Sequence, residues 1–179
     1  MRKVALVAVF VVLAGVYCGG SSKPAVAGAK WPADACGTLT EAEIGQFVKA
    51  LPTFSAALKA GMWTPTPPKE TDGPIGSLAT FVEGMNVAGV DDSLKTAGSS
   101  WGAFKATLYK VFAASAALSI DGVTPEMIAS MKSDTSASAK KGLKDYEAFK
   151  AACALIPEAN KKMVAAHQQE LQALQALGQ

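Results

Sequence analysis

Several side-chain types on which catalytic and metal sites depend are scarce in this chain of 179 residues. Histidine occurs once, at His167, so a metal cluster of several histidines is excluded, and any histidine-based proton relay must use this residue. The sequence has no Cys-x-x-Cys pair and no glycine-rich phosphate loop. The common signatures of zinc, c-type haem and nucleotide-binding proteins are therefore missing.

The chain also lacks a large excess of either basic or acidic residues, and arginine occurs only at Arg2. The chain has 17 basic and 15 acidic residues, and two of the basic ones, Arg2 and Lys3, belong to the N-terminal leader described below. Without them the two classes are equal at 15 each. A near-neutral chain without arginine gives no electrostatic reason to bind nucleic acid, and we expect no nucleic-acid partner.

The first eighteen residues have the layout of a bacterial secretory leader. Arg2 and Lys3 form a short basic region, and residues 4–16 form an almost unbroken apolar run. This run is shorter than the ~20 residues that span a bilayer, which favours processing over permanent insertion. Residues 1–27 are therefore predicted to be a signal peptide, and export is the main expectation about localisation.

Two processing sites compete. The sequence up to Cys18 resembles a bacterial lipobox, in which the cysteine is lipidated and becomes the anchored N-terminus. Alternatively, the small residues of Ala25-Val26-Ala27 direct cleavage that leaves Gly28 first, and the product is then free in the periplasm. Both alternatives remain open, so the protein is expected to be periplasmic or membrane-anchored through a lipid.

Either route takes Cys18 out of the pool of free thiols and leaves Cys36 and Cys153. An even pair of cysteines in an oxidising compartment predicts a disulfide. A Cys36–Cys153 bridge would close a loop of more than a hundred residues.

The remainder is predicted to be all-α. Residues 28–39 are rich in Gly, Ala and Pro and are expected to form a tether, followed by a helical domain over 40–179. Apolar residues at spacings of three and four predict helices over 40–61, 75–88, from 99 or 100 to the turn at 121–122, from 124, and over 137–177 with a division at Pro157. Residues 89–100 are expected to be a hinge. The expected architecture is an antiparallel bundle of four to five helices.

His167 is the one candidate for cofactor binding, because it occupies a position on an apolar helical seam. A helical bundle with a histidine on its last helix and a methionine on an early one resembles the periplasmic b-type cytochromes. That resemblance implies a haem- or redox-binding bundle, with Met62 or Met85 as the second ligand of the iron. The competing interpretation is a partly buried structural histidine, and on that interpretation no cofactor is expected.

Two further patterns bear on chemistry. Ser138 and Lys141 match Ser-x-x-Lys, but the companion motifs of serine hydrolases are absent, so we interpret the match as chance. Asp91 and Asp92 do not continue into a calcium-binding loop, and an acidic role near a helix N-terminus is favoured. The sequence therefore predicts a non-enzymatic envelope protein that binds another envelope protein or a small apolar ligand, with the haem-binding bundle as the alternative.

Overall fold

The fold is that of a computed structural model, which describes residues 30–62 and 73–172. Its regular elements are helical, and no strand of more than a single bridge residue occurs within the described residues. They are the 3₁₀ helix η1 (Ala33–Cys36) and the α-helices α2 (Glu41–Lys59), α3 (Gly73–Glu83), α4 (Val87–Thr96), α5 (Trp101–Asp121), α6 (Pro125–Ser133), α7 (Ala137–Cys153) and α8 (Glu158–Ala166). The all-α class is confirmed. The leader and Cys18 lie outside the described residues.

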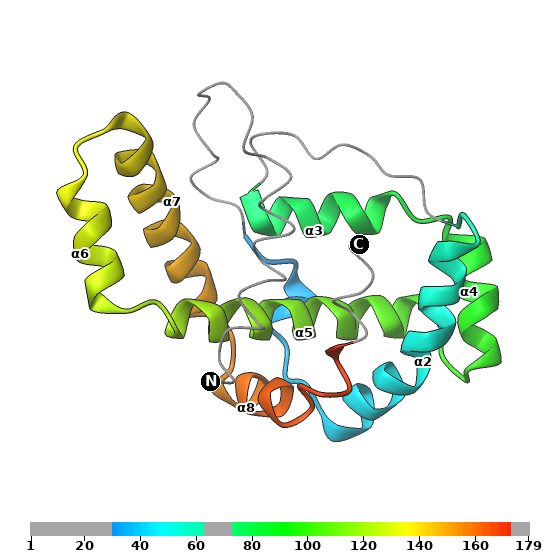
Figure 1. The fold of residues 1–179 in the computed structure, drawn as a ribbon. Helices are drawn as coiled ribbons and strands as arrows, with labels where there is room; N and C mark the ends of the chain where they lie inside the picture. Colours follow the sequence, from blue (N-terminus) through cyan, green and yellow to red (C-terminus); the bar gives the residue numbers. More distant parts are fainter. Residues whose placement is uncertain (1–29, 63–72, 173–179) are drawn as a thin grey trace.

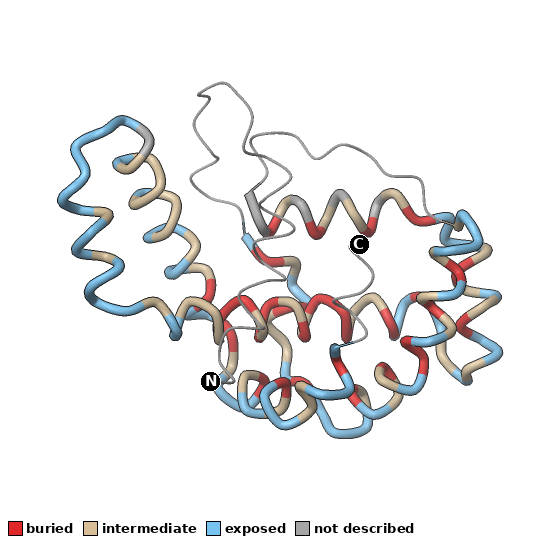
Figure 2. The backbone as a smooth tube through the Cα atoms, in the orientation of Figure 1, coloured by how far each residue is buried: buried red, intermediate tan, exposed pale blue. Residues whose placement is uncertain are grey.

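Helix α5 is the centre of the fold and lies against η1, α2, α4, α7 and α8 (Figure 1). Its side chains are buried along most of its length, as the tube in Figure 2 shows. Four of the buried residues are alanines, whose small side chains allow neighbouring backbones to approach closely: Ala113, Ala114, Ala116 and Ala117. Helix α5 is therefore the core helix of the described fold.

Helix α2 packs on α5 through aromatic rings. The Phe104 ring lies 4.6 Å from that of Phe47 and 4.5 Å from that of Phe54, measured between centroids. A capping box is present at the start of α2: the Thr40 hydroxyl accepts a hydrogen bond from the Glu43 amide, and the Glu43 carboxylate accepts one from the Thr40 amide. Pro52 stands inside α2 without ending it.

The predicted division of residues 75–100 is wrong. The expected single helix over 75–88 is broken after Glu83, and the expected hinge contains α4. The break arises at Asn86, whose side-chain oxygen accepts a hydrogen bond from the Gly89 amide and caps α4. The Asn86 amide itself donates to the carbonyl of Met62, a contact between segments far apart in the sequence.

The expected tether over 28–39 also needs correction, because residues from Trp31 to Leu39 contribute to the core. Trp31, Ala35 and Leu39 are all buried, and η1 packs directly on α5. These three residues are spaced four apart, although only Ala35 lies in η1 and the other two flank it. The surrounding glycine and proline residues conceal this pattern in the sequence.

The C-terminal half divides as expected near Pro157, which stands immediately before α8. Helices α6 and α7 pack against each other, and of this pair α7 makes the main contact with α5 (Figure 1). No single helix in the described part of the chain is long and apolar enough to span a membrane. Helices α5 and α6 together meet the length and composition criterion but are bent by 77°.

Candidate functional site

The α6–α7 hairpin is the least buried part of the described fold (Figure 2). Helix α6 has no buried residue, and Cys153 at the end of α7 is the only one among the described side chains of that helix. The start of α6 is nevertheless well defined: Thr124 caps it by accepting a hydrogen bond from the Met127 amide, and Pro125 occupies its first turn. The hairpin is thus a defined element that buries little surface of its own.

An open groove of about 520 Å³ lies where this hairpin joins the end of α5. This volume falls within the ~300–1,000 Å³ range of small-molecule sites. Aliphatic residues from the end of α5, the turn and α6 provide most of the lining: Ile120, Val123, Pro125, Ile128 and Ala129. Tyr146 on α7 provides an aromatic face.

The charged groups of the groove are mainly positive. Lys132 comes from α6 and Lys150 from α7, and neither forms an ion pair within the described residues. The Lys150 ammonium lies 5.9 Å from the centroid of the Tyr146 ring. Asp121 also lines the groove, but its carboxylate pairs with Lys161 at 2.8 Å. The charge left without a partner in the groove is therefore positive.

His167 lies outside this groove, at the C-terminal end of α8. Its Nε2 is 3.2 Å from a carboxylate oxygen of Glu41 at the start of α2, and its Nδ1 is 3.6 Å from Glu170. Both ring nitrogens thus face carboxylates, and the side chain joins the end of α8 to the beginning of α2. This arrangement matches the structural interpretation of a partly buried histidine.

The structure does not bring His167 together with Met62 or Met85. His167 contacts Glu41 at the first residue of α2, whereas Met62 follows the end of that helix, and Met85 is next to Asn86, which bonds to Met62. A helix of 19 residues is roughly 28 Å long. No single haem iron can be ligated by groups at both ends of α2. Met62 instead accepts a weak hydrogen bond from the Ser93 hydroxyl at 3.6 Å.

The expected Cys36–Cys153 disulfide is absent from the structure, where both residues are free thiols. Cys153 is buried, and this burial, together with the charge of Asp121, raises the pKa of its thiol to about 12. The thiolate is the species that attacks in thiol–disulfide exchange, and at neutral pH it is scarce at this position. The environment of Cys153 thus slows thiol–disulfide exchange at this position.

The remaining candidates are explained by local structure. Asp91 accepts a hydrogen bond from the Trp101 amide at 2.6 Å and so stabilises the start of α5. From the sequence we expected an acidic role near a helix N-terminus for this pair of aspartates. Lys141 pairs with Asp145 at 2.9 Å, and the side chain of Ser138 lies outside the described part. Among the described residues, no group of three or more His, Cys, Asp or Glu side chains is arranged to hold a metal ion.

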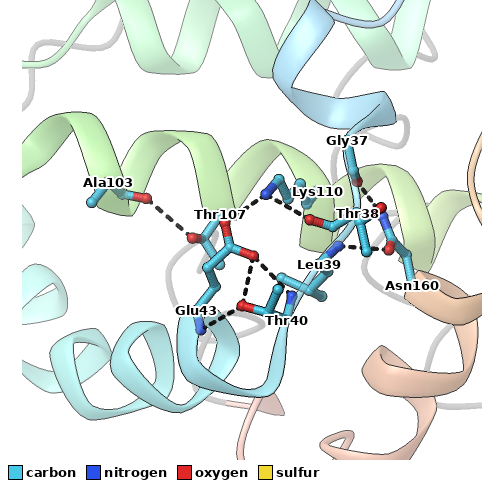
Figure 3. A network of polar contacts seen from close by, with 9 residues as sticks. All are labelled: Gly37, Thr38, Leu39, Thr40, Glu43, Ala103, Thr107, Lys110 and Asn160. Carbon is cyan, nitrogen blue, oxygen red and sulfur yellow. Dashed lines mark hydrogen bonds and ion pairs between the residues drawn. The ribbon is translucent and has the colours of Figure 1, made fainter.

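A polar network fixes the segment before α2 to the core (Figure 3). The Lys110 ammonium donates to the Thr38 carbonyl at 2.8 Å and to the Glu43 carboxylate at 2.6 Å. The side chain of Asn160 accepts from the Leu39 amide and donates to the Gly37 carbonyl, each at 2.8 Å. Each residue labelled in Figure 3 takes part in at least one of these contacts, and all of its partners there belong to the fold, which indicates a structural role.

Sequence reasoning did not find the groove. The one feature of the sequence that indicated the groove was the short helix from Thr124. This helix carries apolar residues at Met127, Ile128 and Met131, and the sequence shows no obvious partner for them. The comparisons add nothing to this assignment: no family model, curated protein or solved structure matches the chain.

Proposed function

We propose that this protein is an exported, non-enzymatic binding protein of the bacterial envelope, and that its ligand occupies the groove at the base of the α6–α7 hairpin. The secretory leader supports the compartment, with a lipid anchor on Cys18 or a free periplasmic product as the two alternatives. We interpret the helices around α5 as a bundle that serves as a scaffold for this hairpin.

The observation that carries the proposal is the contrast between the closed core and the open hairpin. Phe47, Phe54 and Phe104 fill the space between α2 and α5, whereas α6, although well capped, has no buried residue. Its Ile128 and Ala129 side chains face the groove instead. A concave apolar surface with a few polar groups is the usual form of a ligand site.

The groove favours binding over covalent chemistry. Its lining consists of aliphatic side chains, one tyrosine, two lysines and an aspartate that is already paired, with no Ser, Cys or His among them. Such a lining provides apolar contact area and two fixed positive charges. It does not provide the Ser–His or Cys–His pair that acyl transfer commonly uses.

The proposal is tested by filling the groove. We expect the neutral fluorescent dye Nile red to bind the wild-type protein, and Ala129→Trp to weaken this binding at least tenfold because the indole occupies the groove. Ala148→Trp is the matched control, because Ala148 is exposed on the same hairpin and does not line the groove. Equal dye binding by all three proteins, with their helical circular dichroism unchanged, would count against the groove as the binding site.

The two processing alternatives are separated by the intact mass of the exported protein. A mass that includes diacylglycerol on Cys18 identifies a lipoprotein, whereas a chain that begins near Gly28 identifies a free product. A mass equal to that of the full sequence would contradict the predicted leader cleavage.

A further inference from the structure

We infer that the ligand of this groove is a single-chain amphiphile with an anionic head, such as a long-chain carboxylate. The inference rests on the proposed function and goes further by naming the chemical class of the ligand. It combines three features of the groove: its apolar lining, its lysines and its size.

The lining near the end of α5 suits an alkyl chain. Ile120, Val123 and Ile128 present branched aliphatic surface, and Pro125 and Ala129 extend it along α6. Each methylene group that leaves water for an apolar surface stabilises a complex. An alkyl tail therefore gains affinity here with every carbon that the groove covers, and no hydrogen bond is required of it.

The charged side chains specify the head. Lys132 and Lys150 belong to the two helices that pack against each other in the hairpin, and both line the groove. The one carboxylate in the lining, that of Asp121, pairs at 2.8 Å with Lys161, which also pairs with Glu158 at 2.6 Å, and it forms no ion pair with Lys132 or Lys150. An anionic head therefore finds two ammonium groups that have no carboxylate partner among the described residues, whereas a cationic head is repelled.

The size and the rim of the groove limit the ligand further. A volume of about 520 Å³ corresponds to one drug-sized molecule rather than to a two-chain bilayer lipid or a folded partner. Lysine binds an anion as a point charge. It lacks the planar guanidinium with which arginine forms paired hydrogen bonds to a carboxylate or phosphate. We therefore expect selectivity for charge and chain length, with little discrimination between anionic heads of similar size.

Calorimetric titration of the processed protein with three amphiphiles of equal chain length tests this inference. The ligands are dodecanoate, dodecanol and dodecyltrimethylammonium, each below its micelle concentration. We expect dodecanoate to bind about tenfold more tightly than dodecanol, as two partly exposed ion pairs allow, and the cation to bind least. The preference for dodecanoate should shrink as salt is raised, because exposed charges are screened.

Paired lysine variants supply the control. In Lys132→Gln/Lys150→Gln the dodecanoate and dodecanol affinities should become equal. In Lys140→Gln/Lys144→Gln, which alters two exposed lysines of α7 outside the groove, the tenfold preference should persist. Loss of the preference in both double variants would show that it comes from general charge, and would overturn the assignment to Lys132 and Lys150.

The other outcomes separate this inference from the proposed function. If all three amphiphiles bind equally and Ala129→Trp blocks them, the groove is a binding site but the anionic class is wrong. If dodecanoate does not bind while Nile red still does so in an Ala129-dependent way, the ligand inference alone fails. If Ala129→Trp changes neither amphiphile binding nor Nile red binding, the proposed function and the ligand inference both fail.

Discussion

Asn160 on α8 and Leu39, 121 residues earlier in the chain, are joined by a buried hydrogen bond of 2.8 Å from the Leu39 amide to the Asn160 side-chain oxygen. The Asn160 amide group donates in turn to the carbonyl of Gly37 at 2.8 Å. Asn160 is fully buried; its bond with Leu39 forms away from water, and its bond with Gly37 is partly buried. This one side chain fixes the segment before α2 to the C-terminal part of the fold.

We expect Asn160→Ala to lower the free energy of unfolding by about 2–4 kcal/mol, because it leaves the Leu39 amide and the Gly37 carbonyl without their partner. For a domain of this size that loss corresponds to a fall in melting temperature of about 5–15 °C. Thermal unfolding followed by circular dichroism measures it.

Lys162→Ala is the matched control, since Lys162 is exposed on the same helix and forms no ion pair within the described residues. Its free energy of unfolding should stay within about ±0.5 kcal/mol of the wild-type value, as is typical of surface substitutions. A similar small effect of Asn160→Ala would mean that the two hydrogen bonds do not tie these segments together.

The Glu43–Lys110 pair predicts a loss of stability in acid. Burial alone would raise the pKa of Glu43, but hydrogen bonds from Lys110 and Thr40, with the charge of Lys110, together lower it from its ordinary value of 4.5. A carboxylate with a lowered pKa stabilises the fold fully above its unfolded-state pKa, and this contribution is lost as pH falls through the folded-state value. We expect the free energy of unfolding to decline below about pH 4.5.

Lys110→Met removes the partner of Glu43 and should reduce this dependence. The difference in stability between wild type and variant is expected to be largest at neutral pH and to shrink in acid, where Glu43 is protonated in both. Lys49→Met, an exposed change on α2, is the control and should follow the wild-type curve. A Lys110→Met curve parallel to that of the wild type at every pH would contradict the assignment.

Helix starts could be predicted from the sequence because their signals are local. Thr40, Ser100 and Thr124 each cap the helix that follows, and each hydrogen bond spans only three residues. The break at Asn86 could not be predicted in the same way, because it also involves the distant Met62 carbonyl. Local chemistry thus identified most helices but not how the chain divides residues 75–100.

The groove escaped prediction for a related reason. It exists because α6 leaves the end of α5 at 77° and does not continue its direction. The residues at this turn, from Asp121 to Thr124, indicate that a turn occurs but not the angle that it makes. The placement of His167 against Glu41 likewise depends on the docking of α8, which the seam of apolar residues leaves undetermined.

The adjacent acids Asp91 and Asp92 should differ in their effect on stability. Lys95 lies 3.0 Å from both, but Asp91 alone accepts a hydrogen bond from the Trp101 amide at the start of α5. That bond, followed by the one from Lys95, lowers the pKa of Asp91, so its stabilising effect is lost as pH falls.

We therefore expect Asp91→Ala to lower the melting temperature clearly and Asp92→Ala to change it little. Asp91→Asn, which retains an oxygen acceptor for the Trp101 amide, should recover part of the loss. The measurement is thermal unfolding of the three variants at pH 7. Equal melting temperatures for Asp91→Ala and Asp92→Ala would contradict the role of Asp91 at the start of α5.

The two free thiols should differ in reactivity. Burial and the nearby Asp121 raise the pKa of Cys153 to about 12, so only ~10⁻⁴ of this thiol is ionised at pH 8. Cys36 is partly exposed. We expect iodoacetamide to alkylate Cys36 in the folded processed protein and to reach Cys153 only after denaturant is added, as peptide mass spectrometry will show. Cys153→Ala is the control, because the site that reacts only in denaturant should be missing from this variant.

The contrary result would be a protein that resists alkylation at both cysteines and gains two hydrogens on reduction. It would mean that export produces the Cys36–Cys153 bridge, and that the buried thiol is oxidised before the fold closes around it.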